Sequence, residues 1–232
     1  MSPSPEKRAV VRLPRAERMH QIESAARKLF HKHGYTAARI SEIAADAGIS
    51  EAAIYKFYSN KRDLLHTLLK DWYMGMLDDF YEKLEGVEGA RNRIKVIIWQ
   101  HLKSIRECPD LCRLFYSEVR SMPDYYDTEL YELNRRYTLV LVDVVKTGIA
   151  SGELRPDTSS AMVRDVIFGG IEHRVTPFLM GRSEIDIDEM STQLCDLVCQ
   201  GICTPDAGQD MDRLMARLER VADRLDGKAG GG

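Results

Sequence analysis

The stretch "ISEIAADAGISEAAIYKFYSNKRDLL", residues 40–65, holds two short apolar periodicities on either side of one glycine. Ile40 and Ile43 fall on one face of a helix of about two turns, and Gly48 ends that helix. Glycine permits the left-handed conformation that a sharp corner between two helices needs, and Ser50 is expected to cap the next helix with its hydroxyl. The stretch therefore predicts two short helices joined by a tight turn.

The second of these helices has two unlike faces. Ile54, Phe57 and Tyr58 point to one side, where they can anchor the helix on a core. Small, aromatic and charged side chains occupy the other side: Glu51, Ala52, Tyr55, Lys56 and Ser59. A helix-turn-helix needs this arrangement, because its second helix enters a DNA groove about 12 Å wide and reads base edges. The alternative is an αα-hairpin inside a helical scaffold, where the same spacing also occurs.

Charge is divided unevenly along the chain. Residues 1–62 carry 12 Lys and Arg against 6 Asp and Glu, a net charge of +6, whereas the remainder carries 21 against 30, a net charge of −9. This asymmetry suggests that the front segment meets a polyanion while the rest keeps the protein soluble. A chance excess of basic residues on a solvated face is the alternative.

The composition is typical of a soluble globular protein, with 44% hydrophobic and 30% charged residues among 232. No apolar stretch approaches the roughly 20 residues that span a bilayer, and the first residues lack the apolar core of a signal peptide. We therefore expect a cytoplasmic protein without a membrane segment.

Five cysteines, at positions 108, 112, 195, 199 and 203, include no CxxC pair. An odd number without such pairs argues against a secreted disulfide framework. The last three step by four along one side of a predicted helix, where they are expected to pack as small hydrophobic side chains. A metal- or redox-responsive role is the alternative, but no metal site and no cofactor are predicted.

Helical periodicity recurs along almost the whole chain, and no convincing strand pattern interrupts it, so an all-α fold is predicted. After a flexible basic arm over 1–14, a first helix is expected to end at Gly34. Beyond the opening stretch, helices are expected over residues 61–86, 89–108, within 109–122, and over 126–152, 157–181 and 186–203. A final amphipathic helix is expected over 211–225, before a Gly-rich tail.

Residues 34–65, "GYTAARISEIAADAGISEAAIYKFYSNKRDLL", resemble the DNA-binding signature of TetR-family transcriptional regulators. The resemblance implies a homodimer in which each subunit carries a three-helix DNA-binding domain on a larger helical domain for ligand binding and dimerisation. It also implies a regulator, usually a repressor, that binds a palindromic double-stranded DNA operator and is released by a small-molecule effector. The expected division is a basic arm (1–14), a DNA-binding domain (15–62), a ligand-binding and dimerisation domain (63–204), and a C-terminal amphipathic helix with its tail (205–232).

Carried over position by position, the family's DNA contacts fall on Arg39, Ser41, Glu51, Ala52, Tyr55, Lys56 and Lys61. Lys61 is expected to contact a phosphate. Two departures from the family pattern matter, because Arg39 stands where a threonine is usual and Tyr58 where a phenylalanine is usual. Arg39 exchanges a helix cap for a cation, which puts the cap in doubt but favours phosphate binding.

Aromatic or polar residues within apolar helices are the candidates for a ligand pocket: Trp72, Trp99, Phe115, Tyr116, Tyr137, Phe168, His173 and Phe178. Ordinary core or interface packing is the alternative for each of them. The helices over 157–181 and 186–203 resemble the pair that forms the family's dimer interface, where Gly169 and Gly170 permit close approach and Pro177 should kink or shift the helix. The apolar helices suggest a hydrophobic, aromatic or acyl-type effector.

Motifs that mark enzymes are missing from the sequence. The chain contains no Gly-rich phosphate loop, no HExxH, no nucleophile elbow and no carboxylate pair in a clear context. An enzyme is therefore not expected. A helical scaffold protein without DNA binding remains the alternative from another class.

Overall fold

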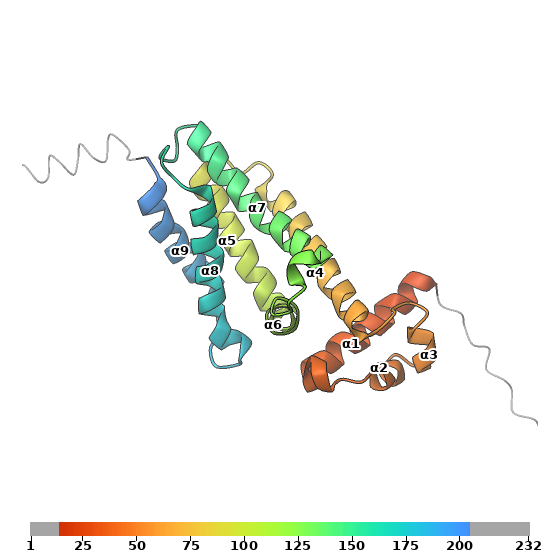
Figure 1. Cartoon of the computed structure of the whole chain (residues 1–232). Coiled ribbons are helices and arrows are strands. Elements are labelled where there is room, and N and C mark those ends of the chain that lie inside the picture. Colours follow the sequence, from red (N-terminus) through yellow and green to blue (C-terminus); the bar gives the residue numbers. More distant parts are fainter. Residues whose placement is uncertain (1–13, 205–232) are drawn as a thin grey trace, which may run out of the picture.

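Two helical units follow one another along the chain, and the long helix α4 (Lys61–Leu84) connects them (Figure 1). The computed structural model describes residues 14–204. The helical elements besides α4 are α1 (Arg15–Ala37), α2 (Ile40–Asp46), α3 (Glu51–Ile54), α5 (Ala90–Glu107), α6 (Pro109–Leu114), the π-helical segment η1 (Phe115–Val119), the 3-10 turn η2 (Tyr125–Asp127), α7 (Glu129–Ala150), α8 (Ser160–Leu179) and α9 (Ile187–Ile202). The all-α prediction is confirmed for the described part of the chain.

Two predicted segments lie outside the described residues. These are the basic arm over 1–14, except for its last residue, and the C-terminal amphipathic helix with its tail over 205–232. Among the helices that the structure describes, none combines the length and the apolar character that a bilayer crossing requires.

The first unit is built around α1, whose inner face buries Ile22, Ala26 and Phe30. α2 and α3 add Ile43 and Ile54, and both side chains are fully buried in the same core. Each short helix therefore packs its apolar face into the core that α1 forms. Its opposite face is left to solvent.

Two glycines make the turns of this unit. Gly34 has a φ of 77° and interrupts the helical dihedrals of α1, although the helix resumes and continues to Ala37. Gly48 has a φ of 67° and forms the corner between α2 and α3. Both values lie in the left-handed region that glycine adopts without strain. The predicted corner at Gly48 is confirmed.

α3 is shorter than the sequence pattern suggested, because only Glu51–Ile54 is α-helical and the residues after it form turns. Ser50 occupies the N-cap position, but its hydroxyl makes no cap hydrogen bond, so the predicted hydroxyl cap is wrong. The reason is the tight first turn, in which the Ala53 amide donates to the Ser50 carbonyl at 2.9 Å. The backbone thus takes the donor that the hydroxyl was expected to satisfy.

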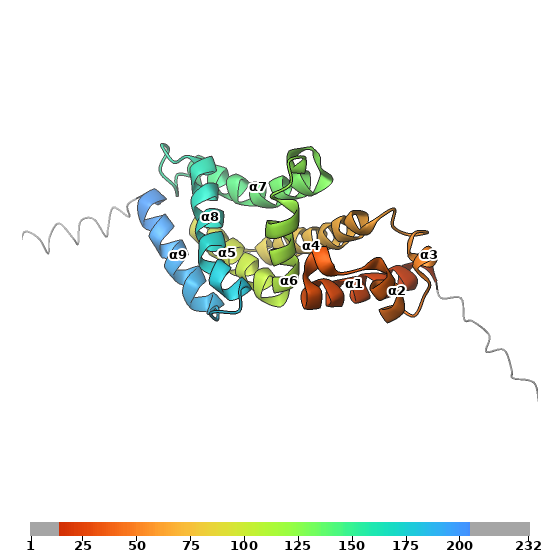
Figure 2. The same cartoon turned by 60° about the horizontal axis from the view of Figure 1, so that its bottom comes forward.

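The second unit is a helical bundle. α4 packs on α5 and α7, α8 lies against α7, and α9 lies against α5 (Figures 1 and 2). Near the middle of the bundle, Phe80 of α4 stacks on Tyr137 of α7 with ring centroids 4.4 Å apart. The predicted boundary between the two domains, at residues 62 and 63, falls in the first turn of α4.

Side-chain caps fix where helices of this unit begin. Asn60, Thr128, Ser159 and Asp186 each accept a hydrogen bond from the backbone amide three residues later. Asp186 caps α9, which confirms the predicted start of the helix over 186–203. The predicted start at Asp157 is wrong, because Ser159 supplies the cap of α8.

α8 differs from its prediction in two further respects. Pro177 does not end the helix, because α8 continues past it to Leu179. A Cβ at Gly169 would meet nothing within 4 Å, and one at Gly170 would meet only Leu194 at 4.0 Å. Within one chain, the two glycines therefore permit no close approach that a larger residue would forbid.

Gly148 of α7 is the glycine at which an added methyl group is expected to cost most. A Cβ there would lie 2.6 Å from the Ala90 Cβ and 2.9 Å from Leu154. We expect Gly148→Ala to lower the free energy of unfolding by about 1–3 kcal/mol, measured from denaturant midpoints. Gly75→Ala is the matched control, because that Cβ meets nothing within 4 Å and alanine favours a helix. A Gly148→Ala midpoint equal to the control's would contradict the expectation.

Candidate functional site

The outer face of α2 and α3 is a solvent-exposed surface that carries most of the predicted DNA contacts. Its exposed members are Arg39, Ser41, Glu51, Ala52, Tyr55 and Lys56. Tyr55 is 50% exposed, which is a high fraction for an aromatic side chain. Among residues 14–204, the side chains of Arg39, Glu51 and Lys56 form no ion pair. This surface, called the reading surface below, is therefore free to meet a partner.

Arg39 keeps its guanidinium free because Glu42 caps α2 in another way. The Arg39 backbone N–H donates to the Glu42 carboxylate at 3.1 Å. This is the backward half of a capping box, in which the third helical residue satisfies the cap amide. Glu42 thus caps the start of α2 in place of the threonine that is usual at position 39. The Arg39 side chain takes no part in the cap and remains exposed.

Tyr58 ties the turn after α3 to α1. Its ring is buried, and its hydroxyl donates to the Glu23 carboxylate at 2.5 Å. Burial, together with the hydrogen bond to Glu23, raises the pKa of Tyr58 well above its usual value, so the phenol stays protonated. A phenylalanine could not make this bond. The tyrosine, where the family usually has phenylalanine, therefore adds a hydrogen bond that holds the turn after α3 on α1.

Lys61 has a role that the sequence did not reveal. Its Nζ donates to the carbonyls of Tyr35 at 2.8 Å, Thr36 at 3.1 Å and Ala38 at 3.0 Å. The ammonium group also lies 4.6 Å from the Tyr35 ring centroid. An ammonium has three protons to donate, and all three are used here. Lys61 caps the end of α1 in this arrangement, so its ammonium is not free for the predicted phosphate contact.

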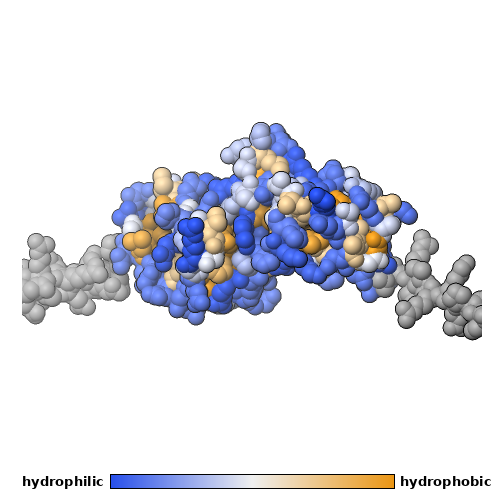
Figure 3. Space-filling model, turned by 90° about the horizontal axis from the view of Figure 1, so that it is seen from below, coloured by the Kyte–Doolittle hydropathy of each residue, from blue (hydrophilic) through white to orange (hydrophobic). Residues whose placement is uncertain are grey.

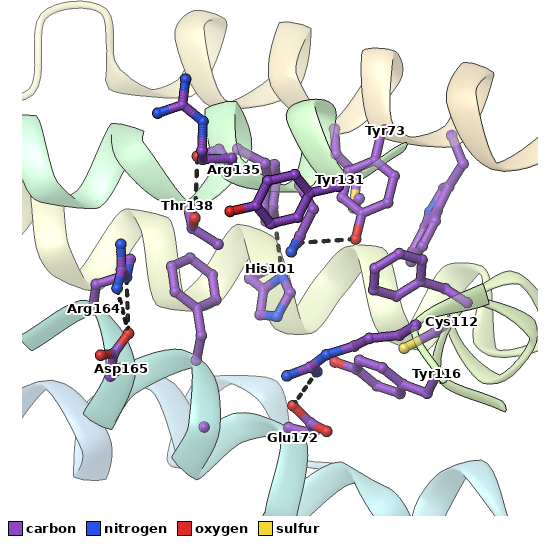
Figure 4. Close-up of a pocket in the computed structure, with 18 residues that line it drawn as sticks. Tyr73, His101, Cys112, Tyr116, Tyr131, Arg135, Thr138, Arg164, Asp165 and Glu172 are labelled. Carbon is purple, nitrogen blue, oxygen red and sulfur yellow. Dashed lines mark hydrogen bonds and ion pairs between the residues drawn. The ribbon is translucent and has the colours of Figure 1, made fainter. Parts of the chain in front are cut away.

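The second unit contains a cavity of about 420 Å³ between α4, α5, η1, α7 and α8 (Figure 4). Seven aromatic rings line it: Trp72, Tyr73, Phe115, Tyr116, Tyr131, Tyr137 and Phe168. Its volume lies in the range of about 300–1,000 Å³ that is usual for small-molecule sites. An aromatic lining with a few polar groups is also usual for such sites.

The structure brings together five of the eight residues predicted for a ligand pocket. These are Trp72, Phe115, Tyr116, Tyr137 and Phe168. Trp99 lies elsewhere, because its indole N–H donates to Asp188 of α9 at 2.6 Å. His173 is exposed and Phe178 half-buried on other sides of α8. Phe168 faces the cavity, and the helical period of 3.6 residues turns those two away from it.

Several lining residues were missed in the sequence. Among them, His101 had a visible signal, since it interrupts the apolar face of α5 that Ile94, Ile97 and Ile105 form. A polar residue on a buried helix face often marks a polar site. Asn134 and Arg120 had no comparable signal, because only the tertiary fold brings α7 and the residue after η1 to the same cavity.

The polar groups inside the cavity are mainly uncharged. His101 Nδ1 and the Tyr137 hydroxyl oxygen are 2.8 Å apart. The Tyr73 hydroxyl donates to the Asn134 side-chain carbonyl at 3.2 Å, and the Asn134 amide donates to the Tyr125 hydroxyl at 3.1 Å. Burial lowers the pKa of His101 to about 3, so its imidazole is neutral at pH 7.

Charged groups of the lining lie in ion pairs (Figure 4). Arg120 donates to Glu172 at 2.5 Å and lies 5.6 Å from the Tyr116 ring centroid, and Arg164 pairs with Asp165 at 2.8 Å. Arg135, which pairs with Glu132 at 3.1 Å, is the third arginine of the lining. The side chains of these three arginines are 31–53% exposed, so they form a basic rim where the cavity meets solvent.

The cysteines of α9 pack against α5. Cys195 and Cys199 are buried with their sulfur atoms 3.8 Å apart, and the Cys195 thiol lies 3.6 Å from the Arg91 carbonyl. Cys203 is half-buried one turn further on. Within residues 14–204, no group of three His, Cys, Asp or Glu side chains could hold a metal ion. The metal-responsive alternative therefore has no candidate site in this region.

Two polar contacts lie where the reading head, α1–α3, and the start of α4 meet the second unit. His31 Nδ1 of α1 lies 2.5 Å from the Asp110 carboxylate of α6, which also accepts from Arg113 at 2.8 Å. Arg62, in the first turn of α4, pairs with Asp124 next to η2 at 2.7 Å. The segment α6–η1 that holds α1 also supplies cavity-lining aromatic side chains. The same short stretch thus contacts α1 of the reading head and lines the cavity.

Comparisons with known proteins cover both units. Residues 22–68 match the family "Bacterial regulatory proteins, tetR family", and residues 70–201 match "YsiA-like protein, C-terminal region". The chain is 26% identical over 182 residues to the fatty acid metabolism regulator protein of Bacillus subtilis (strain 168), covering 78% of this chain and 94% of that protein.

Solved structures show the same architecture. The crystal structure of the transcriptional regulator FadR from Bacillus subtilis, in complex with stearoyl-CoA, superposes with a TM-score of 0.70 at 26% identity, covering 77% of this chain and 96% of that one. The fatty acid degradation regulator FadR from Bacillus halodurans superposes with a TM-score of 0.70 at 22% identity, covering 80% and 96%. The second likeness shows the fold.

Proposed function

This chain belongs to the TetR family of transcriptional regulators, which are not enzymes, and we propose that it is a dimeric repressor that an acyl-CoA releases from its operator. The observation that carries the proposal is that one chain has both an exposed reading surface and an aromatic cavity with a basic rim. The likeness to the fatty acid metabolism regulator of Bacillus subtilis and to FadR in complex with stearoyl-CoA supports an acyl-type effector.

The reading surface supplies what groove recognition needs. Small Ala52 lets α3 approach the bases, while Tyr55 and Lys56 extend from its exposed end. Arg39, free of intramolecular partners among the described residues, is available for a phosphate at the start of α2. Because phosphate contacts position a protein and base contacts give specificity, the two sets have separate roles.

The outer faces of α8 and α9 support the proposed dimer. Met162 and Val166 of α8 are 62% and 47% exposed, and Leu197 of α9 is 68% exposed. Figure 3 shows apolar patches at this end of the molecule and also at the opposite end. An isologous contact between two copies would bury these side chains.

The cavity supports an acyl group inside and an anionic carrier outside. Its aromatic lining excludes water and favours an apolar chain. The arginines of the rim, Arg120, Arg135 and Arg164, suit phosphate groups, because guanidinium groups bind them in bidentate geometry. CoA carries its phosphates at the end away from the acyl chain, so one molecule would satisfy both regions.

The shared segment α6–η1 supports a route for release. A ligand that displaces Phe115 or Tyr116 must shift this segment, and Asp110 at its start holds His31 of the reading head. The π-helical turn of η1 is a conformation often found at functional sites. Ligand and operator would then favour different positions of the head, which is the definition of a two-state switch.

Selection from random DNA followed by ligand competition tests the proposal. The protein is expected to enrich a near-palindrome whose half-sites reflect two-fold symmetry. Stearoyl-CoA is then expected to weaken binding to that sequence by about 5- to 150-fold, the usual range of allosteric coupling, whereas free CoA should not. Enrichment of no common site would overturn the DNA-binding proposal, and tighter binding with stearoyl-CoA would overturn release.

A further inference from the structure

His101 lies among the lining residues of the cavity, between the Arg164–Asp165 pair on one side and Cys112 on the other (Figure 4). Its side chain comes from α5 and is held by two neighbours. Nδ1 is 2.8 Å from the Tyr137 hydroxyl, and the Phe168 ring meets the imidazole edge-on at 5.0 Å between centroids. Only 8% of the residue is exposed, so its orientation is fixed by packing.

The second ring nitrogen of His101, Nε2, faces the cavity. It has no hydrogen-bond partner among residues 14–204. It is also absent from the fully buried polar atoms that lack a partner, so its surface is not completely covered by protein. Nε2 therefore borders the open volume that the imidazole helps to line. A polar atom of a largely buried side chain directed into an apolar cavity is available to a ligand.

The hydrogen bond with Tyr137 decides what Nε2 offers. We assign the Tyr137 hydroxyl as the donor to Nδ1 of His101, because the two atoms are 2.8 Å apart and this hydroxyl makes no other hydrogen bond within the described residues. A neutral imidazole that accepts at one nitrogen carries its proton on the other. Nε2 is therefore an N–H donor directed into the cavity.

The donor is uncharged, and this limits its partner. Burial lowers the pKa of His101 to about 3, so the imidazole brings no positive charge into the cavity at pH 7. A carboxylate placed against the imidazole would lose its hydration and would meet no positive charge on that ring. A neutral carbonyl oxygen needs no such compensation.

We propose that the Nε2–H of His101 donates to the thioester carbonyl oxygen of the acyl-CoA effector, and so distinguishes the thioester from the free fatty acid. The inference rests on the proposed function. The thioester carbonyl of an acyl-CoA lies between its apolar chain and its anionic carrier. His101 lies among the aromatic side chains of the cavity lining.

The test compares stearoyl-CoA with its thioether analogue S-octadecyl-CoA, which lacks only the carbonyl oxygen, and with stearate. Binding to the full-length protein is measured by calorimetry. Wild type is expected to bind stearoyl-CoA about tenfold or more tightly than the thioether, and stearate more weakly than either. His101→Phe should abolish the preference for the thioester over the thioether.

Tyr137→Phe serves as the second variant, because it keeps the ring and removes only the hydroxyl that fixes the imidazole proton. Its preference for the thioester should fall, even if His101→Phe does not fold. Equal binding of thioester and thioether by wild type overturns the role of His101 and leaves the acyl-CoA proposal intact. Binding of neither CoA derivative overturns both. An undiminished preference in either folded variant overturns the role of His101 alone.

Discussion

Replacing Tyr55 and Lys56 together with alanine is expected to weaken operator binding by about 100-fold or more, because each base or phosphate contact contributes about 1–3 kcal/mol. A dimer loses both contacts twice. Both side chains are exposed and bury no part of the core, so thermal unfolding should be unchanged. Fluorescence anisotropy with the selected operator measures the loss, and circular dichroism confirms the fold.

The matched control is Tyr81→Ala with Lys83→Ala, near the other end of α4. Tyr81 is 60% exposed and Lys83 is also exposed, so this pair removes the same residue types from a surface far along the chain from α3. Operator affinity should stay within about twofold of wild type. A control that loses as much affinity as the first pair would show that Tyr55 and Lys56 act through general charge and not through the reading surface.

Replacing Val166 and Leu197 together with glutamate is expected to convert the proposed dimer into monomers. An isologous interface would place four carboxylates against apolar surface, and a desolvated charge without a partner is costly. Sedimentation velocity should show one species near the chain mass of 26.4 kDa. Operator affinity should fall by about 100-fold or more, since a monomer engages only one half-site.

Met74→Glu with Tyr81→Glu controls for added charge on α4. Both residues are exposed apolar side chains outside α8 and α9, so this variant should remain a dimer and bind DNA. Dissociation of the control as well would point to a general effect of negative charge. A Val166 and Leu197 variant that stays dimeric would place the interface on another face of the molecule.

Local chemistry in the sequence was sufficient to predict much of the fold. The corner at Gly48 and the start of α9 at Asp186 depend on groups within a few residues of each other, so spacing alone reveals them. The failures have a common cause, which is competition from the backbone or from a distant chain segment. The amide that the Ser50 hydroxyl was expected to cap donates to a backbone carbonyl instead. The Lys61 ammonium donates to backbone carbonyls more than 20 residues earlier in the chain.

The cavity could be predicted only in part, for the same physical reason. Large aromatic side chains in apolar helices are visible in sequence, and five of the predicted eight meet in one place. Which of them face inward depends on how each helix is rotated against its neighbours. Trp99 illustrates the limit, because Asp188, 89 positions away, draws it to α9. His101 shows the reverse, since only the contact with Tyr137 reveals its free nitrogen.

Because α4 connects the reading head to the cavity, the proposed switch should also let the operator affect effector binding. The helix has 24 residues, so it is about 36 Å long; its first residue holds the end of α1, while Trp72 and Tyr73 line the cavity. Thermodynamic reciprocity requires the operator to weaken effector binding by the same factor by which the effector weakens operator binding. Copies on DNA would then be poorer sensors than free copies, and the number of operators in a genome would set the effector concentration at which the last of them is vacated.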